Sequence, residues 1–303
     1  MRHAKRHRSV LLSEPEPRPS DTPPNVHMVA DPARIMARAN SENFPVAARW
    51  LPQPARGHLL AIYGFARLAD QLGDAVPGDR LAALDWLADQ VDHAFAGDPG
   101  HPLMRPLADT IAECGLSREP FARLIEANRT DQHVFYYNRF EDLLGYCDLS
   151  ANPVGELVLE VFGVATPERI ALSNAVCTAL QLVEHWQDVS EDLTLGRVYI
   201  PLEDLARYGC SLEDLQAPRV ADALRAVLTL EATRTSALLD QGRPLVMSLR
   251  GWPRLAVAGF VGGGRAALSA LAHADYEVLA GTPRPTRRRT IGSILRALNG
   301  PRL

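Results

Sequence analysis

Hydrophobic residues recur at helical spacing along most of this chain, from about Pro32 to about Gly281. No stretch alternates hydrophobic and polar positions as a half-buried strand would. Helices are expected over residues 55–74, from Asp79 to about Ala96, from Ser117 toward Tyr136, from Thr166 to about Leu193, and over residues 218–249 and 253–280. Asp79, Ser117 and Thr166 are residue types that cap helix N-termini by accepting hydrogen bonds from backbone N–H groups. The pattern therefore predicts an all-α fold.

The helical pattern fills a single domain, expected over residues 33–283, and the composition changes at both ends. Residues 1–32 carry many prolines and no hydrophobic periodicity, which predicts a disordered tail. Residues 284–303 are basic, with arginines at 284, 287, 288 and 289, and are expected to form a mobile or docking tail. A solvated tail is a better interpretation of that run than an RNA-binding patch.

The overall composition narrows the class of protein. The chain has 303 residues, 47% of them hydrophobic and 22% charged, which is enough to bury a core. Its net charge of −4 gives no bias toward nucleic acid. The four cysteines form no Cys-x-x-Cys pair, so neither a zinc site nor a disulfide framework is expected, and the cytoplasm is the predicted compartment. We also expect no stretch with the ~20 apolar residues that span a bilayer.

Two pairs of aspartates share one spacing. Asp70 and Asp74 lie near the end of one expected helix, and Asp188 and Asp192 lie near the end of another. Residues at i and i+4 share a helix face, so each pair projects two carboxylates in one direction, at the cost of repulsion between like charges. Mg²⁺ takes oxygen ligands and usually binds through one or two carboxylates plus substrate phosphates. Two such pairs that face each other would hold a diphosphate through bridging Mg²⁺ ions.

A solvated helix face is the competing interpretation, because acidic pairs at this spacing are common on protein surfaces. The neighbouring residues favour a site instead. Asp70 ends an apolar segment that contains Arg67 one turn earlier. Polar residues at 181, 184, 188 and 192 step along one face of an otherwise apolar helix. Such polar stripes usually face a site or a polar cavity rather than a packed core.

These segments resemble the squalene and phytoene synthase family. Residues 63–74 resemble its motif Tyr-x-Phe-x-Arg-x-x-Asp-Asp-x-x-Asp. Residues 181–192 resemble its Gln-x-x-Asn-x-x-x-Asp-x-x-x-Asp, and residues 196–201 resemble the Gly-Arg-x-Tyr-x-Pro that follows. Further matches are Ser41-Glu42-Asn43-Phe44, Tyr146-Cys147 with Val154-Gly155, and Tyr276-Glu277-Val278-Leu279. The matches keep their order over about residues 36–281.

The resemblance implies a helical bundle of the class I isoprenoid synthase type, with a central apolar cavity and a Mg²⁺-dependent reaction of an isoprenoid diphosphate. The metal ligands that it implies are Asp70, Asp74, Glu184, Asp188 and Asp192. The catalytic residues that it implies are Asp70, Asp74, Asp188, Asp192, Arg67 and Tyr63. The substrate-binding residues that it implies are Ser41, Asn43, Phe44, Arg67, Gln181, Arg197 and Tyr276. Enzymes of squalene and hopanoid synthesis are its implied partners, and peripheral contact with a membrane would suit a greasy substrate.

Within the family, residues 42–45 and 149–155 look most like the hopanoid-pathway branch, which converts presqualene diphosphate to hydroxysqualene. The reaction of that branch needs no NADPH, because water captures the cation. Gln71 stands where many members have a second adjacent Asp, and Glu184 replaces the usual Asn. Gln187 replaces a basic residue of many condensing members, which fits an enzyme that handles one diphosphate.

Two alternatives stay open. The first is a head-to-head condensing synthase that makes presqualene diphosphate, squalene or phytoene. The second is a non-catalytic assembly factor of the same fold, which the presence of all four aspartates disfavours.

Three smaller features carry expectations of their own. The glycines at 262–264 lie inside a helical pattern, so close helix packing is expected there rather than a nucleotide-binding loop. His185 lies among apolar neighbours and is expected to be a core or supporting histidine rather than a base. Pro153 removes a backbone N–H beside Asn152. Either the helix is kinked there and Asn152 holds the water that captures the cation, or Asn152 caps a helix that starts at Pro153.

Overall fold

A computed structural model describes residue 26 and residues 51–299 of the chain. The expectations for Ser41, Asn43 and Phe44, and for a disordered tail over residues 1–32, fall almost entirely outside these described residues.

The regular structure of the described residues is helical, as expected. The helices are α2 (Ala55–Asp74), α3 (Arg80–Phe95), α4 (Met104–Cys114), α5 (Glu119–Thr130), α6 (Phe140–Ser150), α7 (Asn152–Val161), α8 (Pro167–Gln187), α9 (Val189–Thr194), α10 (Leu202–Arg207), the 3₁₀ helix η3 (Glu213–Gln216), α11 (Asp222–Gly242), α12 (Pro244–Ser248), α13 (Gly251–His273) and α14 (Arg287–Leu298). Outside the helices, an isolated parallel bridge joins Tyr136 to Val198.

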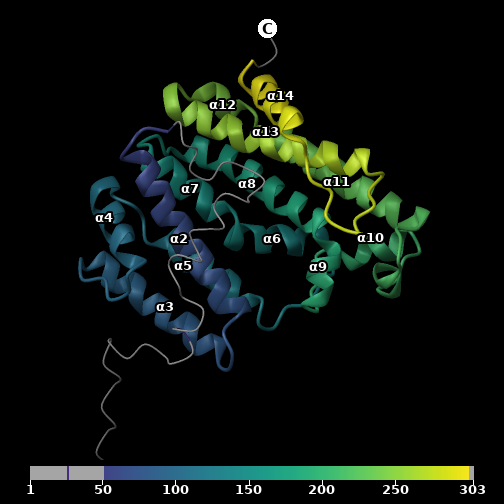
Figure 1. Ribbon diagram of the computed structural model, residues 1–303, viewed down its shortest axis with the longest axis horizontal. Coiled ribbons are helices and arrows are strands. Elements are labelled where there is room, and N and C mark those ends of the chain that lie inside the picture. The colour runs from purple at the N-terminus through teal and green to yellow at the C-terminus, as the bar shows by residue number, and fades with distance from the viewer. Residues whose placement is uncertain (1–25, 27–50, 300–303) are drawn as a thin grey trace, which may run out of the picture.

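Helix α8 lies in the middle of the bundle, with α7, α11 and α13 packed against it (Figure 1). Helices α3 and α4 pack on α2 at one side, while α12, α13 and α14 form the opposite edge. Apolar side chains fill the space between helices; for example, Phe65 of α2 meets Phe121 of α5 edge to face at 5.1 Å between ring centroids. This packing brings the ends of α2 and α8, which carry the aspartate pairs, toward one another.

Two of the three predicted N-caps are confirmed. Asp79 accepts a hydrogen bond from the backbone of Ala82 at 3.0 Å, and Thr166 accepts one from Arg169 at 3.3 Å. Ser117 is not a cap, because its hydroxyl donates to Glu160 Oε1 at 2.5 Å and α5 begins at Glu119. That helix also ends at Thr130, short of the expected Tyr136 region.

The long helices predicted from periodicity are interrupted in the structure. The helix expected from Thr166 to Leu193 breaks at Asp188, whose φ of −104° and ψ of 20° lie outside helical geometry. The stretch 218–249 divides into α11 and α12 at Pro244, which lacks the N–H that a continuous helix needs. Helix α13 ends at His273, so Tyr276 lies beyond it.

Part of the C-terminal segment, which was expected to form a mobile or docking tail, is helical, and this helix, α14, packs along α13. The contact depends on Gly262, where an added Cβ would lie 2.6 Å from the Cα of Ile294. A Cβ on Gly264 would lie 2.9 Å from Leu180 Cδ2. Close packing at the glycines is therefore confirmed.

Helix α13 also corrects the expectation that no segment is long and apolar enough to cross a bilayer. It passes that test by length and composition, yet 67% of the apolar window is buried inside the bundle. This burial is what a core helix of the fold requires, and the test by itself is weak evidence of a span.

Candidate active site

A cavity of about 380 Å³ opens between α2, α5, α6, α7, α8 and the chain after α9. One end is lined by apolar side chains such as Leu59, Ile62, Val154 and Val158. The polar side chains that line it are Tyr63, Arg67, Asp70, Asp74, Asn128, Asp131, Tyr146, Ser150, Gln181, Glu184, His185, Asp188, Asp192, Arg197 and Tyr199. All four predicted aspartates therefore face one space.

The first motif lines one wall through successive turns of α2. Arg67 Nε donates to the Tyr63 hydroxyl at 3.2 Å, and its Nη1 lies 3.4 Å from Asp70 Oδ2. The Arg67 guanidinium also lies 5.6 Å from the centroid of the Tyr63 ring. Tyr63 thus holds the guanidinium beside the Asp70 carboxylate, at the wall of the cavity.

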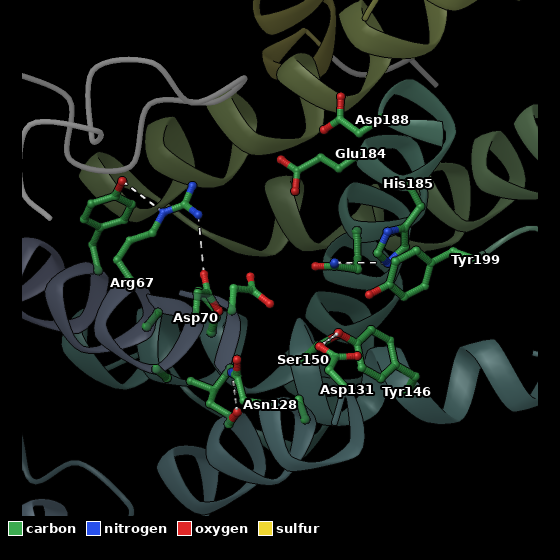
Figure 2. Close-up of a pocket in the computed structure, with 18 of the residues that line it drawn as sticks. Arg67, Asp70, Asn128, Asp131, Tyr146, Ser150, Glu184, His185, Asp188 and Tyr199 are labelled. Atoms are coloured by element: carbon green, nitrogen blue, oxygen red, sulfur yellow. Dashed lines mark hydrogen bonds and ion pairs between the residues drawn. The ribbon is translucent and has the colours of Figure 1, made fainter. Parts of the chain in front are cut away.

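The second motif lines the facing wall at the end of α8. Figure 2 shows Glu184 and Asp188 across the open space from Asp70. Asp188 Oδ1 accepts a hydrogen bond from the Thr282 hydroxyl at 3.0 Å. Gln181 Nε2 lies 3.2 Å from His185 Nε2, and His185 Nδ1 lies 3.7 Å from Asp192 Oδ2. His185 therefore supports Gln181 and Asp192 rather than acting alone, in line with the expected supporting role.

An ion pair connects the two motifs, because Arg197 Nη2 lies 2.8 Å from Asp74 Oδ1. Beneath this pair, the His185 ring stacks on Tyr199 with centroids 3.6 Å apart. Tyr146 lies beside Tyr199 and donates its hydroxyl to Asp131 Oδ2 at 2.8 Å. The packing of these aromatic rings holds the neighbouring charged side chains in place.

Burial shifts the acidity of several cavity carboxyls. Burial raises the pKa of Asp70 to about 6, with Asp74 adding to the rise and Arg67 opposing it. Although 47% of the Asp70 side-chain surface is accessible, that surface faces the cavity. Burial likewise raises the pKa of Asp131 to about 6 against the lowering effect of Arg197, and it raises the pKa of Asp188. Negative charge is therefore costly in the cavity until cations neutralise it.

The donor set suits Mg²⁺ shared with a diphosphate. Within residues 51–299, no three carboxylate, histidine or cysteine side chains gather closely enough to enclose a metal ion by themselves. The facing carboxylates of the two motifs are hard oxygen ligands, and such ligands hold Mg²⁺ in pairs together with substrate phosphate oxygens and water. Asp70, Asp74, Glu184, Asp188 and Asp192 are the residues that would hold it.

A second, apolar cavity of about 120 Å³ adjoins the first. The two share the lining residues Ser150, Val154, Val158, Gln181, Glu184 and Phe260. Apolar side chains of α8, α12 and α13, including Leu180, Leu245 and Val257, line much of the second cavity. A ligand with a charged head and a long hydrocarbon tail would match this division.

The family model for squalene/phytoene synthase matches residues 37–290. The chain belongs to the squalene/phytoene synthase family.

Individual relatives support this assignment. The chain is 36% identical over 212 residues to the hydroxysqualene synthase of Rhodopseudomonas palustris. The aligned region covers 69% of this chain and 72% of the relative. It is 32% identical over 201 residues to the presqualene diphosphate synthase of the same organism, with 65% and 71% coverage. The crystal structure of squalene synthase HpnC from Alicyclobacillus acidocaldarius superposes with a TM-score of 0.74 at 42% identity, covering 86% of this chain and 99% of that one.

Two residues predicted to bind substrate do not line either cavity of this family member. Tyr276 packs against the apolar cluster formed with α8 and α11 and adopts a positive φ of 57°. Asn152 is buried, but its amide donates to Asp148 Oδ1 at 2.5 Å and its carbonyl oxygen accepts from Thr178 at 3.0 Å. Asn152 is also not a cap, because α7 already includes it and the chain kinks at Ala151. The hypothesis that Asn152 holds a water in the cavity therefore lacks a structural basis.

Sequence reasoning missed Asn128, Asp131 and Ser150 as cavity residues of this squalene/phytoene synthase family member. Asn128 and Asp131 lie three residues apart at the end of α5, on a face that otherwise carries Leu124 and Ala127. That polar pair on an apolar face was the available signal, and it matches the reasoning used for the aspartate motifs.

Proposed function

We propose that this protein catalyses the Mg²⁺-dependent ionisation of presqualene diphosphate and the capture of the cation by water, which gives hydroxysqualene and diphosphate. The observation that carries the proposal is the joined pair of cavities, one lined by facing carboxylates and the other by apolar side chains. Similarity to hydroxysqualene synthases from three bacteria, at 32–36% identity, supports the choice of reaction.

In this proposal each part of the site has a task. Arg67 and Arg197 donate hydrogen bonds to the diphosphate, each from beside an aspartate. Mg²⁺, when bound, acts as a Lewis acid that neutralises the leaving diphosphate. The carboxylates would hold this Mg²⁺, Gln181 orients the head group, and the apolar cavity keeps water from the hydrocarbon. The cation therefore forms where solvent access is limited.

A specific contact favours one diphosphate over two. Gln187 stands where many condensing members carry a basic residue, and its side chain is fully buried and donates to the carbonyl of Pro283. Neither cavity is lined by Gln187. This position therefore contributes no donor for a second diphosphate.

The test supplies the purified protein with presqualene diphosphate or with farnesyl diphosphate, with and without Mg²⁺, and without NADPH. We expect diphosphate and hydroxysqualene from presqualene diphosphate alone. Formation of presqualene diphosphate, squalene or phytoene from farnesyl diphosphate would support the alternative, head-to-head condensation, which similarity to the presqualene diphosphate synthase makes the second candidate. Absence of any Mg²⁺-dependent diphosphate release would leave the assembly factor as the better description.

We also propose that the protein works in the cytoplasm and contacts an anionic membrane through the edge formed by α12, the start of α13 and α14 (Figure 1). Large apolar side chains are exposed along this edge, namely Met247, Trp252, Leu255, Ile291 and Leu295. Arg254 links its parts, since its Nη2 lies 3.7 Å from Met247 Sδ and donates to the carbonyl of Leu298 at 2.8 Å.

The charged residues of this edge are all basic. Residues 243–260 and 286–299 contain no Asp or Glu, while arginines occur at 243, 250, 254, 287, 288, 289 and 296. Exposed apolar side chains rimmed by arginine match an anionic bilayer surface. The apolar cavity reaches the same helices through Leu245 and Val257, so this edge lies over the hydrocarbon end of the site.

A further inference from the structure

Two buried side-chain oxygens of the main cavity have no hydrogen-bond partner in the described part of the chain. They are Asp131 Oδ1 and Ser150 Oγ. Asp131 Oδ2, in contrast, accepts the hydroxyl of Tyr146 at 2.8 Å. Buried polar atoms without a protein partner usually mark the place of an ordered water.

The two atoms belong to one wall of the cavity. Tyr146 and Ser150 lie one turn apart on α6, so their side chains share a helix face. Since Tyr146 binds Asp131, the three residues are neighbours, and Figure 2 shows Ser150 beside Asp131 and Tyr146 and across the cavity from Glu184. The Tyr146 hydroxyl fixes the carboxylate so that its second oxygen remains available.

Ser150 also occupies the boundary between the two cavities, because it lines both of them. The rest of the shared lining consists of Val154, Val158 and Phe260, which offer no hydrogen bonds to water, and of Gln181 and Glu184. A water held at Ser150 would therefore lie between the diphosphate end and the hydrocarbon end of a bound substrate.

We propose that Ser150 and Asp131 hold the water molecule that captures the carbocation, and that Asp131 accepts its proton. This inference rests on the proposed hydroxysqualene reaction. The carbon–oxygen bond to diphosphate breaks and its electron pair leaves with diphosphate. A lone pair of the water then forms the new carbon–oxygen bond, and one water proton passes to the Asp131 carboxylate, while Ser150 Oγ accepts a hydrogen bond from the other hydrogen.

Ser150 and Asp131 thus take the water-holding role expected for Asn152, whose side-chain amide and carbonyl oxygen bind Asp148 and Thr178 instead. When the water donates its two hydrogens to these acceptors, the lone pairs of its own oxygen face the cavity, where the cation forms. A water without these two acceptors would be free to leave the cavity before the cation forms.

The decisive experiment compares Ser150→Ala with wild type on presqualene diphosphate, and measures diphosphate release and hydrocarbon products separately. We expect diphosphate release to stay within about twofold and the fraction of hydroxysqualene to fall about tenfold, with eliminated or rearranged hydrocarbons in its place. Ser150→Thr, which keeps the hydroxyl, is expected to restore the alcohol. Asp131→Asn is expected to lower the alcohol fraction as well.

Ser269→Ala on α13 is the matched control, since it removes a serine hydroxyl from a helix position that lines neither cavity. Its alcohol fraction is expected to equal that of wild type. If wild type forms hydroxysqualene and Ser150→Ala keeps the same fraction and rate, the inference is wrong while the proposed function stands. If Ser150→Ala loses diphosphate release and alcohol together, Ser150 has a structural role and the inference is also wrong. If wild type forms no hydroxysqualene, the proposed function itself fails.

Discussion

Arg197 and Asp74 form an ion pair of 2.8 Å that joins the end of α2 to the chain after α9. Asp131 is the other carboxylate whose charge acts on Arg197, and together the two acids raise the pKa of this guanidinium although burial lowers it. Arg197 thus offsets part of the negative charge of the site before any metal or diphosphate arrives. Binding of diphosphate then requires Arg197 to exchange part of its contact with Asp74 for contact with phosphate oxygens.

We expect Asp74→Ala and Asp188→Ala to lower the rate of diphosphate release by about 10²–10³-fold or more, because each removes a carboxylate that would hold the Mg²⁺ needed to neutralise the charge developing on diphosphate. The fold should remain intact. Arg197 keeps Asp131 as a counter-charge in Asp74→Ala, and each substitution relieves repulsion within a carboxylate pair. Steady-state rates across a Mg²⁺ titration and thermal melts would check both parts. A rate near wild type at saturating Mg²⁺ would contradict the metal role.

We expect stability to fall at alkaline pH because of Glu231, which is fully buried on α11. Burial, with a hydrogen bond shared with Asp204, raises its pKa from 4.5 to about 8, against the lowering effect of Arg234. A raised pKa in the folded state stabilises the fold fully below pH 4.5, and this stability is lost as the pH rises through about 8. Between pH 7 and 9 the loss is on the order of 1 kcal/mol.

The Glu231 prediction is checked by chemical denaturation at several pH values. Glu231→Gln keeps hydrogen-bonding capacity but cannot ionise, so its free energy of unfolding should vary less with pH over this range. An unchanged pH dependence in the variant would assign the alkaline loss to another group.

We expect Gly155→Ala to destabilise the protein by about 1–3 kcal/mol, the usual cost of overpacking a core. An added Cβ would lie 2.5 Å from Cys177 Sγ and closer still to Ser173 Oγ, so α7 could not keep its present contact with α8. Gly145→Ala on the neighbouring α6 is the control, because nothing lies within 4 Å of its added Cβ. That variant should gain about 0.5–1 kcal/mol from helix propensity. Equal effects of the two substitutions on urea unfolding would show that the α7–α8 contact tolerates a methyl group.

We expect the protein to sediment with vesicles that contain phosphatidylglycerol and not with vesicles of phosphatidylcholine alone. Arg287→Glu combined with Arg288→Glu should weaken binding about tenfold or more, since each basic residue near an anionic surface contributes about 1 kcal/mol. Arg105→Glu on α4 with Arg219→Glu in the loop before α11 gives the same net charge from exposed positions elsewhere. Binding that is insensitive to lipid charge, or a concentration-dependent dimer abolished by the same α14 variant, would overturn the membrane proposal.

The sequence predicted the parts of the site that depend on local spacing. The two aspartate pairs, Arg67 and Gln181 lie where the motif and helix periodicity place them, since both follow from one helix at a time. Asp131 and Ser150 escaped prediction because only the packing of α5 against α6 brings them to the cavity. Sequence spacing also does not show which partners engage a side chain. Asn152 is engaged by Asp148 and Thr178, and Tyr276 packs against an apolar cluster, so neither lines the two cavities.

Because the helix breaks at Asp188, the two aspartates of the second motif are held by different helices. Asp188 ends the central helix α8, whereas Asp192 belongs to α9, a six-residue helix that packs against η3. Leu215 of η3 is buried where Val189 and Leu193 converge. The separation between these carboxylates therefore depends on an aliphatic contact outside the main cavity. Substitution of one of these three aliphatic residues would change the spacing of the carboxylates. Evolution could therefore alter the site while every residue that touches the substrate stays the same.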